Sequence, residues 1–192
     1  MLGVLCLQGA FIEHIRMFRS LGAETVEIRQ KKDLFENALD GVVIPGGEST
    51  VMGKLLKELG MEAELRRRIR EGMPVFGTCA GLILLAERVA NDDRTYLSTM
   101  DITVRRNAYG RQLGSFAAVS SFAGVGEVPM TFIRAPFIEE AGKAVEVLSV
   151  VDGKIVAARQ GNQLVTAFHP ELTGDPRIHA YFLKMMKGQE IL

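Results

Sequence analysis

The chain has 192 residues, and its 23 Lys and Arg side chains balance its 23 Asp and Glu side chains, so the formal net charge is zero. This balance excludes the strongly basic surface typical of nucleic-acid-binding proteins and the polybasic patch of membrane-surface proteins. A hydrophobic fraction of 47% is enough for a sizeable core, and the length suits a single domain spanning residues 1–192.

The first apolar run and the two cysteines bear on the cellular compartment. Residues 2–7 form an apolar run that is too short for a signal sequence or a membrane-spanning helix. We therefore expect a cytoplasmic protein in which Cys6 and Cys79 stay unbridged. Since the sequence has no CxxC pair and no histidine–cysteine spacing typical of metal sites, we expect neither a metal nor a cofactor.

The first half of the chain alternates strand-like and helical patterns. Short apolar runs predict buried strands at residues 3–8, 25–29, 41–45 and 74–78. Apolar side chains at helical spacing predict helices over residues 11–22, over residues 50–71 with a break at Gly60, and over residues 81–90.

The second half is dominated by strands. They are predicted at residues 102–107, 114–122, 130–135, 145–151, 154–160 and 163–169, with hairpin turns at Asp152-Gly153 and Gly161-Asn162, and a helix follows over residues 175–187. This order predicts an α/β fold in which a mostly parallel sheet carries an antiparallel extension. Functional sites in such sheets gather at the carboxyl ends of strands, where Gln8, Gly46, Cys79 and His169 fall.

The stretch Gly77-Thr78-Cys79-Ala80-Gly81 is the strongest chemical signal. It has the form G-x-C-x-G, the cysteine version of a nucleophile elbow, between a predicted strand and a predicted helix. Glycines suit the sharp turn because a Cβ would obstruct it, and the amide dipoles of the helix favour a thiolate. The N–H of Ala80 would face a developing oxyanion. The alternative is an inert core cysteine, which fits Cys6 better because we expect that residue in the middle of the predicted strand 3–8.

A nucleophilic cysteine needs a base and a group that orients the base. His169 ends a predicted strand, and Glu171 follows two residues later. If the backbone stays extended through Pro170, both side chains project to the same side, and Glu171 can hold one imidazole nitrogen. The alternative is a surface turn after the last strand. We expect His14 and His179 to lie on the polar faces of their helices, in contact with solvent.

The loop after the third strand, residues 44–53, carries Gly46-Gly47. These glycines let backbone amides approach a ligand closely, and Ser49 or Thr50 can cap the following helix. The loop is then either an ordinary capped turn or an oxyanion site, with the Gly47 N–H acting beside that of Ala80. The spacing of a Walker phosphate loop is absent.

Several segments together resemble a known family. PGGEST, FGTCAGLILLA, RRNAYGRQ, TFIRAP and AFHPELT are similar to the glutaminase subunits of pyridoxal phosphate synthase, which are triad glutamine amidotransferases. The resemblance covers essentially the whole chain. It implies a three-layer, doubly wound, flavodoxin-like α/β fold forming one glutamine amidotransferase domain.

The resemblance also implies a reaction, in which glutamine is hydrolysed to glutamate and ammonia through a glutamyl thioester. It assigns Cys79 as nucleophile, His169 as acid and base, Glu171 as the group that holds His169, and Gly47 and Ala80 as oxyanion donors. The residues that it places around glutamine are Gly46, Gly47, Glu48, Ser49, Arg106, Ile133 and Arg134. An arginine suits a carboxylate because its donors form a planar fork, although from the residues alone both arginines also fit as surface charges on strands.

A partner is implied as well: a synthase subunit with a (β/α)8 barrel, in a large hetero-oligomer, that receives the ammonia. Gln8 resembles a family residue that organises the oxyanion site on docking, and the first helix is a candidate docking element. Two alternatives stay open at this point. One is a stand-alone cysteine hydrolase of the same fold, similar to gamma-glutamyl hydrolases. The other is a non-catalytic regulator that senses redox state through Cys79.

Overall fold

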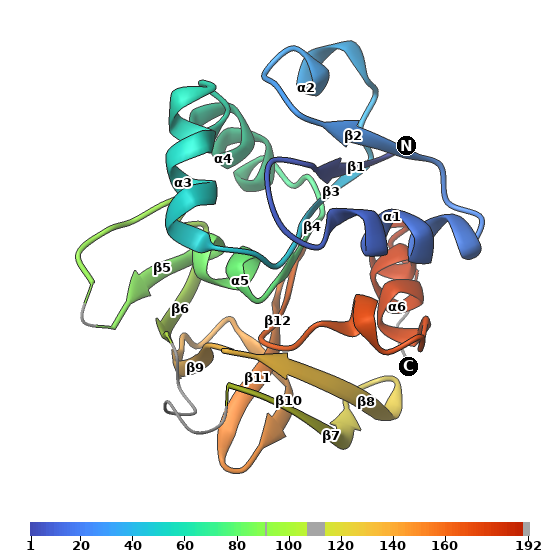
Figure 1. Cartoon of the computed structure of the whole chain (residues 1–192), viewed down its shortest axis with the longest axis vertical. Coiled ribbons are helices and arrows are strands. Elements are labelled where there is room, and N and C mark those ends of the chain that lie inside the picture. The colour runs from blue at the N-terminus through green and yellow to red at the C-terminus, as the bar shows by residue number, and fades with distance from the viewer. Residues whose placement is uncertain (91, 107–113, 190–192) are drawn as a thin grey trace.

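A mixed ten-stranded sheet forms the centre of the molecule (Figure 1). The structure is a computed structural model that describes residues 1–90, 92–106 and 114–189. Within these residues the strand order is β2-β1-β3-β4-β12-β11-β9-β6-β5, and β10 also pairs with β11. The predicted α/β class with a mixed sheet is confirmed.

The parallel half of the sheet carries the strand ends that matter for function. It consists of β2 (Thr25–Ile28), β1 (Leu2–Leu5), β3 (Gly41–Ile44), β4 (Val75–Thr78) and β12 (Gln163–Thr166), in that order. β1, β3, β4 and β12 are buried along their whole length, as expected for continuous apolar runs covered on both faces. Their carboxyl ends therefore lie side by side.

The antiparallel extension comes from the second half of the chain. It contains β11 (Lys154–Gln160), β10 (Glu146–Val151), β9 (Phe137–Ala141) and β6 (Met100–Arg105), with β5 (Ala86–Val89) parallel to β6 at the edge. β7 (Ser115–Phe122) and β8 (Gly126–Ile133) form a separate hairpin. The turn between β10 and β11 is confirmed at Asp152-Gly153, where both residues have positive φ angles, as a type I′ turn requires.

Helices cover both faces of the parallel half, which gives three layers (Figure 1). On one face lie α1 (Phe11–Ser20) and α6 (Arg177–Met186), and on the other lie α3 (Ser49–Glu58), α4 (Glu62–Arg70) and α5 (Ala80–Leu85). The predicted break at Gly60 is confirmed, because this residue has a φ of 65° between α3 and α4. No helix among the described residues is long and apolar enough to cross a membrane.

One predicted helix is wrong in its second half. The helix expected over residues 81–90 ends at Leu85, and the chain continues as β5. An apolar run by itself does not distinguish a buried helix from a buried strand, and pairing with β6 decided the outcome. Three short elements were not predicted: α2 (Asp33–Glu36), β9 and a 3₁₀ turn at Pro170–Leu172.

Candidate active site

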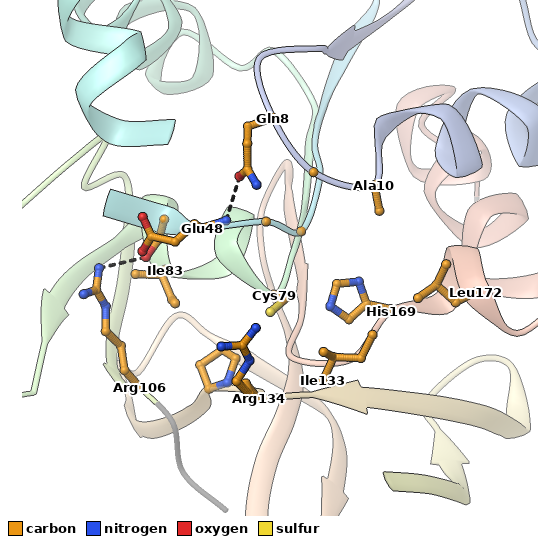
Figure 2. A pocket seen from close by; sticks show the side chains of 15 residues that line it. Gln8, Ala10, Glu48, Cys79, Ile83, Arg106, Ile133, Arg134, His169 and Leu172 are labelled. Carbon is orange, nitrogen blue, oxygen red and sulfur yellow. Dashed lines mark hydrogen bonds between the residues drawn. The ribbon is translucent and has the colours of Figure 1, made fainter. Parts of the chain in front are cut away.

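A cavity of about 490 Å³ opens at the carboxyl ends of β1, β3, β4 and β12 (Figure 2). Its lining includes most of the residues singled out from the sequence: Gln8, Gly46, Gly47, Glu48, Ser49, Cys79, Arg106, Ile133, Arg134 and His169. Glu171 lies behind His169, and Ala80 follows Cys79 in the chain and is buried. The sheet topology thus brings together segments from positions 8 to 171 of the chain.

Cys79 occupies a sharp turn between β4 and α5. Its φ of 47° and ψ of −95° lie in a region that costs a non-glycine residue about 1–3 kcal/mol. The backbone is held by the Cys79 N–H, which donates to the Thr166 carbonyl at 2.8 Å. A Cβ on Gly81 would lie 2.1 Å from the Ile44 carbonyl oxygen, so only glycine fits there. The expected reason for this glycine is confirmed.

His169 follows β12 and points into the same cavity as Cys79 (Figure 2). Its backbone N–H donates to the Thr131 carbonyl at 2.8 Å, and its Nδ1 lies 2.7 Å from Glu171 Oε1. The predicted pairing of these side chains is confirmed, but the expected backbone is wrong. The chain does not stay extended, since Pro170–Leu172 form a 3₁₀ turn that brings Glu171 back under the imidazole.

The surroundings of His169 favour its protonated form. Burial alone would lower the pKa of His169, but its interactions with Cys79 and Glu171 outweigh burial and raise the pKa to about 10. The imidazole therefore carries a positive charge at neutral pH. A cation beside the sulfur stabilises a thiolate, so the pair has the electrostatics that a cysteine nucleophile needs.

The loop after β3 packs directly against this pair. A Cβ on Gly46 would lie 2.2 Å from His169 Cε1, so the absence of a side chain lets the loop approach the imidazole. The Gly46 carbonyl accepts from the Ala10 N–H at 3.0 Å, and the Glu48 N–H donates to Gln8 Oε1 at 2.7 Å (Figure 2). The segment after β1 therefore fixes the loop from one side.

The cap of α3 differs from the prediction. Glu48, and not Ser49 or Thr50, is the N-cap residue, and its carboxylate accepts from the Thr50 N–H at 3.2 Å and the Val51 N–H at 2.7 Å. Burial would raise the pKa of Glu48, but these backbone hydrogen bonds and nearby Arg106 lower it. The Glu48 carboxylate thus caps the helix by accepting from its first N–H groups. The Ser49 hydroxyl is not needed as a cap and makes another contact.

That contact is with Arg106. Its Nη2 donates to Ser49 Oγ at 2.7 Å and to the Tyr96 hydroxyl at 3.0 Å, and its Nη1 lies 3.3 Å from Asp92 Oδ2. The Nε atom has no hydrogen-bond partner among the described residues. Arg106 is therefore a fixed cation at the cavity wall. The rest of the RRNAYGRQ segment, residues 107–112, lies outside the described residues.

The other arginine of the cavity, Arg134, follows the end of β8. It has a φ of 42°, and its backbone N–H donates to the Gly114 carbonyl at 2.6 Å. Ile133 precedes it and presents its side chain to the same cavity (Figure 2). A ligand in the cavity would meet two guanidinium groups and one aliphatic side chain on this wall.

The prediction for the two remaining histidines is wrong. His14 and His179 are fully buried, and their rings contact each other, with Nδ1 of His14 3.0 Å from Nε2 of His179. Burial lowers the pKa of His179 to about 3, and burial together with the other histidines lowers the pKa of His14 well below 6.5. Helical spacing placed these residues beside polar neighbours, but α1 and α6 pack against each other and cover both.

These buried histidines make the fold sensitive to acid. In the folded protein both histidines stay neutral at a pH where the unfolded chain already binds protons, that is, below pH 6.5. The contribution of the two neutral histidines to the unfolding free energy is therefore present above that pH and is lost as the pH falls. Between about pH 7.5 and about pH 5 we expect a loss of up to about 2 kcal/mol per histidine in unfolding free energy, measured by urea titration. Over the same pH range the double variant His14→Leu/His179→Leu should lose less unfolding free energy than the wild type. An equal loss would contradict the assignment of the acid sensitivity to these two histidines.

Sequence reasoning missed several residues of the cavity: Gly9, Ala10, Ile83, Pro136 and Leu172. Proximity in the chain could have indicated four of them, since they adjoin or nearly adjoin Gln8, Arg134 or Glu171. Ile83 lies four residues after Cys79, which is the spacing of one helical turn. The apolar side chains among them give the polar centre a partly hydrophobic rim.

This chain is similar to known proteins over almost its whole length. A protein of Methanocorpusculum labreanum named pyridoxal 5'-phosphate synthase subunit PdxT is 60% identical, over 97% of this chain and 98% of its own. A Streptococcus pneumoniae protein of the same name is 53% identical, over 97% of both chains. A crystal structure of a glutamine amidotransferase matches with a TM-score of 0.92 at 44% identity, over 97% of this chain and 98% of that one.

The family comparison covers almost the whole sequence. Residues 4–188 match the SNO glutamine amidotransferase family. This span contains every residue of the cavity described above. The chain therefore belongs to the SNO glutamine amidotransferase family.

Proposed function

We propose that the chain hydrolyses L-glutamine to L-glutamate and ammonia, as the glutaminase subunit of a pyridoxal 5'-phosphate synthase. The observation that carries the proposal is that Cys79 and His169 line the same cavity, with Glu171 behind His169 and its Oε1 atom 2.7 Å from His169 Nδ1. The names of the relatives support the synthase. The whole chain, residues 1–192, acts as one glutamine amidotransferase domain in this proposal.

The proposed reaction proceeds in two halves. Cys79 Sγ attacks the side-chain amide carbon of glutamine, and His169 gives its proton to the nitrogen as the carbon–nitrogen bond breaks and ammonia leaves. Water then attacks the thioester carbon while His169 takes a proton, the carbon–sulfur bond breaks, and glutamate leaves. Glu171 holds the imidazole in both halves, consistent with a pKa of His169 raised to about 10. Backbone N–H groups of Gly47 and Ala80 stabilise the oxyanion in each half.

Glutamine binds along the wall formed by the loop after β3 and the end of β8. Gly46, Gly47, Glu48 and Ser49 line one side of the cavity, and Ile133 and Arg134 line the other. Arg106 supplies positive charge for the α-carboxylate of glutamine, and its place in the cavity lining supports this role. Glu48 supplies negative charge near the site for the α-ammonium group.

Ammonia passes to a synthase subunit with a (β/α)8 barrel, in a large hetero-oligomer located in the cytoplasm. In this proposal Gln8 organises the oxyanion site when the subunits dock, because its side chain already holds the backbone of Glu48 at 2.7 Å. The exposed face of α1, which includes Ile12, takes part in docking.

An assay of glutamate and ammonia release, with and without the synthase subunit, tests the function. We expect turnover that rises when the synthase is added. Full turnover without any partner would indicate a stand-alone cysteine hydrolase instead. Absence of turnover in both conditions would overturn the proposed function and favour a non-catalytic role.

The substrate contact at Arg106 gives a separate prediction. Replacing Arg106 with methionine keeps the length of the side chain but removes its charge and its contact with Ser49. We expect the KM for glutamine to rise about tenfold to a hundredfold, with a smaller change in kcat, because a charged hydrogen bond to a carboxylate is worth about 1.5–3 kcal/mol. Arg105→Met is the matched control, since Arg105 pairs with Glu139 outside the cavity. Equal KM values for the two variants would contradict the assignment.

A further inference from the structure

Behind the triad, away from the cavity, a second set of buried polar side chains reaches Glu171. His14 comes from α1 and His179 from α6, and they meet above the end of β4. His14 Nε2 lies 3.1 Å from Thr78 Oγ1 and 3.4 Å from Glu171 Oε2. That carboxylate oxygen has no hydrogen-bond partner within the described part of the chain.

The placement of the ring N–H groups of His14 and His179 depends on which neighbouring atoms can accept a hydrogen bond. A carboxylate accepts only, so an N–H on His14 Nε2 attracts Glu171 Oε2, whereas a bare nitrogen would repel it. Because His14 is buried and neutral, it carries a single N–H. With that N–H on Nε2, 3.1 Å from Thr78 Oγ1 and 3.4 Å from Glu171 Oε2, the Nδ1 atom accepts from the Nε2–H of His179. His179 Nδ1 has no partner among the described residues and is left as an acceptor, which costs less than an orphaned N–H.

We propose that His14 is a positioning residue for the triad. Its Nε2–H donates to Thr78 Oγ1 and lies close enough to Glu171 Oε2, with a nitrogen–oxygen distance of 3.4 Å, to attract that oxygen electrostatically and keep Oε1 turned toward His169 Nδ1. A carboxylate approached on both oxygens rotates less about its terminal torsion, so the imidazole that it holds keeps one orientation. His14 does not line the cavity and therefore acts through Glu171 and not on the substrate. The inference rests on the proposed function, since positioning affects turnover only if His169 is the catalytic base.

The competing interpretation is that His14 and His179 only fill the core. Their rings do pack against aromatic side chains: His179 lies 4.8 Å from Phe18 and 5.8 Å from Phe76, measured between ring centroids. The two interpretations predict different effects of a substitution that removes the N–H of His14 but keeps apolar packing. If His14 only fills the core, such a substitution changes stability alone, whereas a positioning role means that kcat changes as well.

Steady-state kinetics with the synthase subunit present provide the first test. We expect His14→Leu to lower kcat about tenfold to a hundredfold with KM for glutamine unchanged, the cost of a small misplacement of the base. His14→Gln, whose amide can place an N–H near the Nε2 position, should recover most of the loss. Ile15→Val, a neighbouring buried position on α1, is the control and should keep the wild-type kcat. A wild-type kcat in His14→Leu would overturn the inference.

The double variant His14→Leu/His179→Leu separates positioning from packing. Removing His14 alone leaves the Nε2–H of His179 buried without an acceptor, and removing both partners relieves that cost. We expect the unfolding midpoint of the double variant to lie above that of His14→Leu while kcat stays low. If kcat recovers together with stability, His14 acts only through packing and the inference is wrong.

Histidine NMR gives a readout that does not depend on glutamine turnover. The chain has only three histidines, so their ring nitrogen signals can be assigned with single variants. We expect neutral Nε2–H forms for His14 and His179, and a low-field Nδ1–H signal for His169 that weakens or shifts in His14→Leu. An unchanged His169 signal would overturn the inference even if the wild type proved inactive. Conversely, a shifted signal in a protein without turnover would leave the positioning intact and overturn only the proposed function.

Discussion

Replacing Cys79 with alanine is expected to lower glutamine hydrolysis at least about ten-thousandfold, to background, because no other group can form the thioester. The protein should remain folded, since alanine keeps the Cβ and the 2.8 Å hydrogen bond from the backbone of residue 79 to Thr166 is retained. The measurement is glutamate release in the presence of the synthase subunit, together with an unfolding curve. Activity within tenfold of the wild type would rule out Cys79 as the nucleophile.

Cys6 provides the matched control. It is the only other cysteine, it is buried in the segment after β1, and burial raises the pKa of its thiol to about 11. Cys6→Ala should therefore keep wild-type turnover. A glutamine-derived electrophile should label Cys79 and leave Cys6 unmodified, and labelling at Cys6 would contradict the assignment.

The same position offers a test of backbone strain. A residue with a φ of 47° carries a conformational cost that glycine avoids. Cys79→Gly should be as inactive as Cys79→Ala and yet more stable than it, by about 1 kcal/mol. Such a result would show that the backbone conformation of Cys79, which places the sulfur in the cavity, lowers the stability of the fold.

Replacing Glu171 with glutamine is expected to lower kcat about a thousandfold while leaving the fold intact. The amide has the shape of the carboxylate but no negative charge, so protonated His169 loses a partner that raises its pKa to about 10. The pKa of His169 should fall toward 6.5, the usual value, in a histidine NMR titration. The triad assignment fails if kcat stays within a few-fold of the wild type.

Glu139 supplies the control for this loss of charge. Its carboxylate accepts a hydrogen bond from Arg105 at 2.7 Å on the antiparallel part of the sheet, outside the cavity. Glu139→Gln removes one negative charge from the chain, as Glu171→Gln does. Because the pair is partly exposed, we expect a change of less than about 1 kcal/mol in stability and none in kcat.

The sequence indicated the proposed nucleophile and its proposed base because both signals are local. The elbow around Cys79 needs glycine beside a strand end, and the crowding around Gly81 leaves no room for another residue. The pairing of His169 with Glu171 depends on two positions in one short turn, so it was predicted correctly although the turn itself is 3₁₀ and not extended. Chemistry of this kind depends on a few consecutive residues and can therefore be predicted from the sequence.

The errors concern features that depend on distant partners. Residues 86–89 form a strand because β6 offers a parallel edge, and the sequence around them contains no sign of that edge. The cap of α3 is Glu48, one residue before Ser49 and two before Thr50, where the distant Gln8 side chain accepts from the Glu48 N–H at 2.7 Å.

The sequence alone determined the length, the charge balance and the alternation of strands and helices. It also determined the elbow around Cys79 and the His-x-Glu pair. Only the tertiary structure decided that His14 and His179, 165 positions apart, meet in the core and reach the far side of Glu171. The physical reason is that periodicity reports the polarity of neighbours along one helix, whereas burial depends on which other helix packs against it. Here α6 covers the face of α1 that carries His14, and a histidine expected in solvent lies instead in the core, beside the proposed triad.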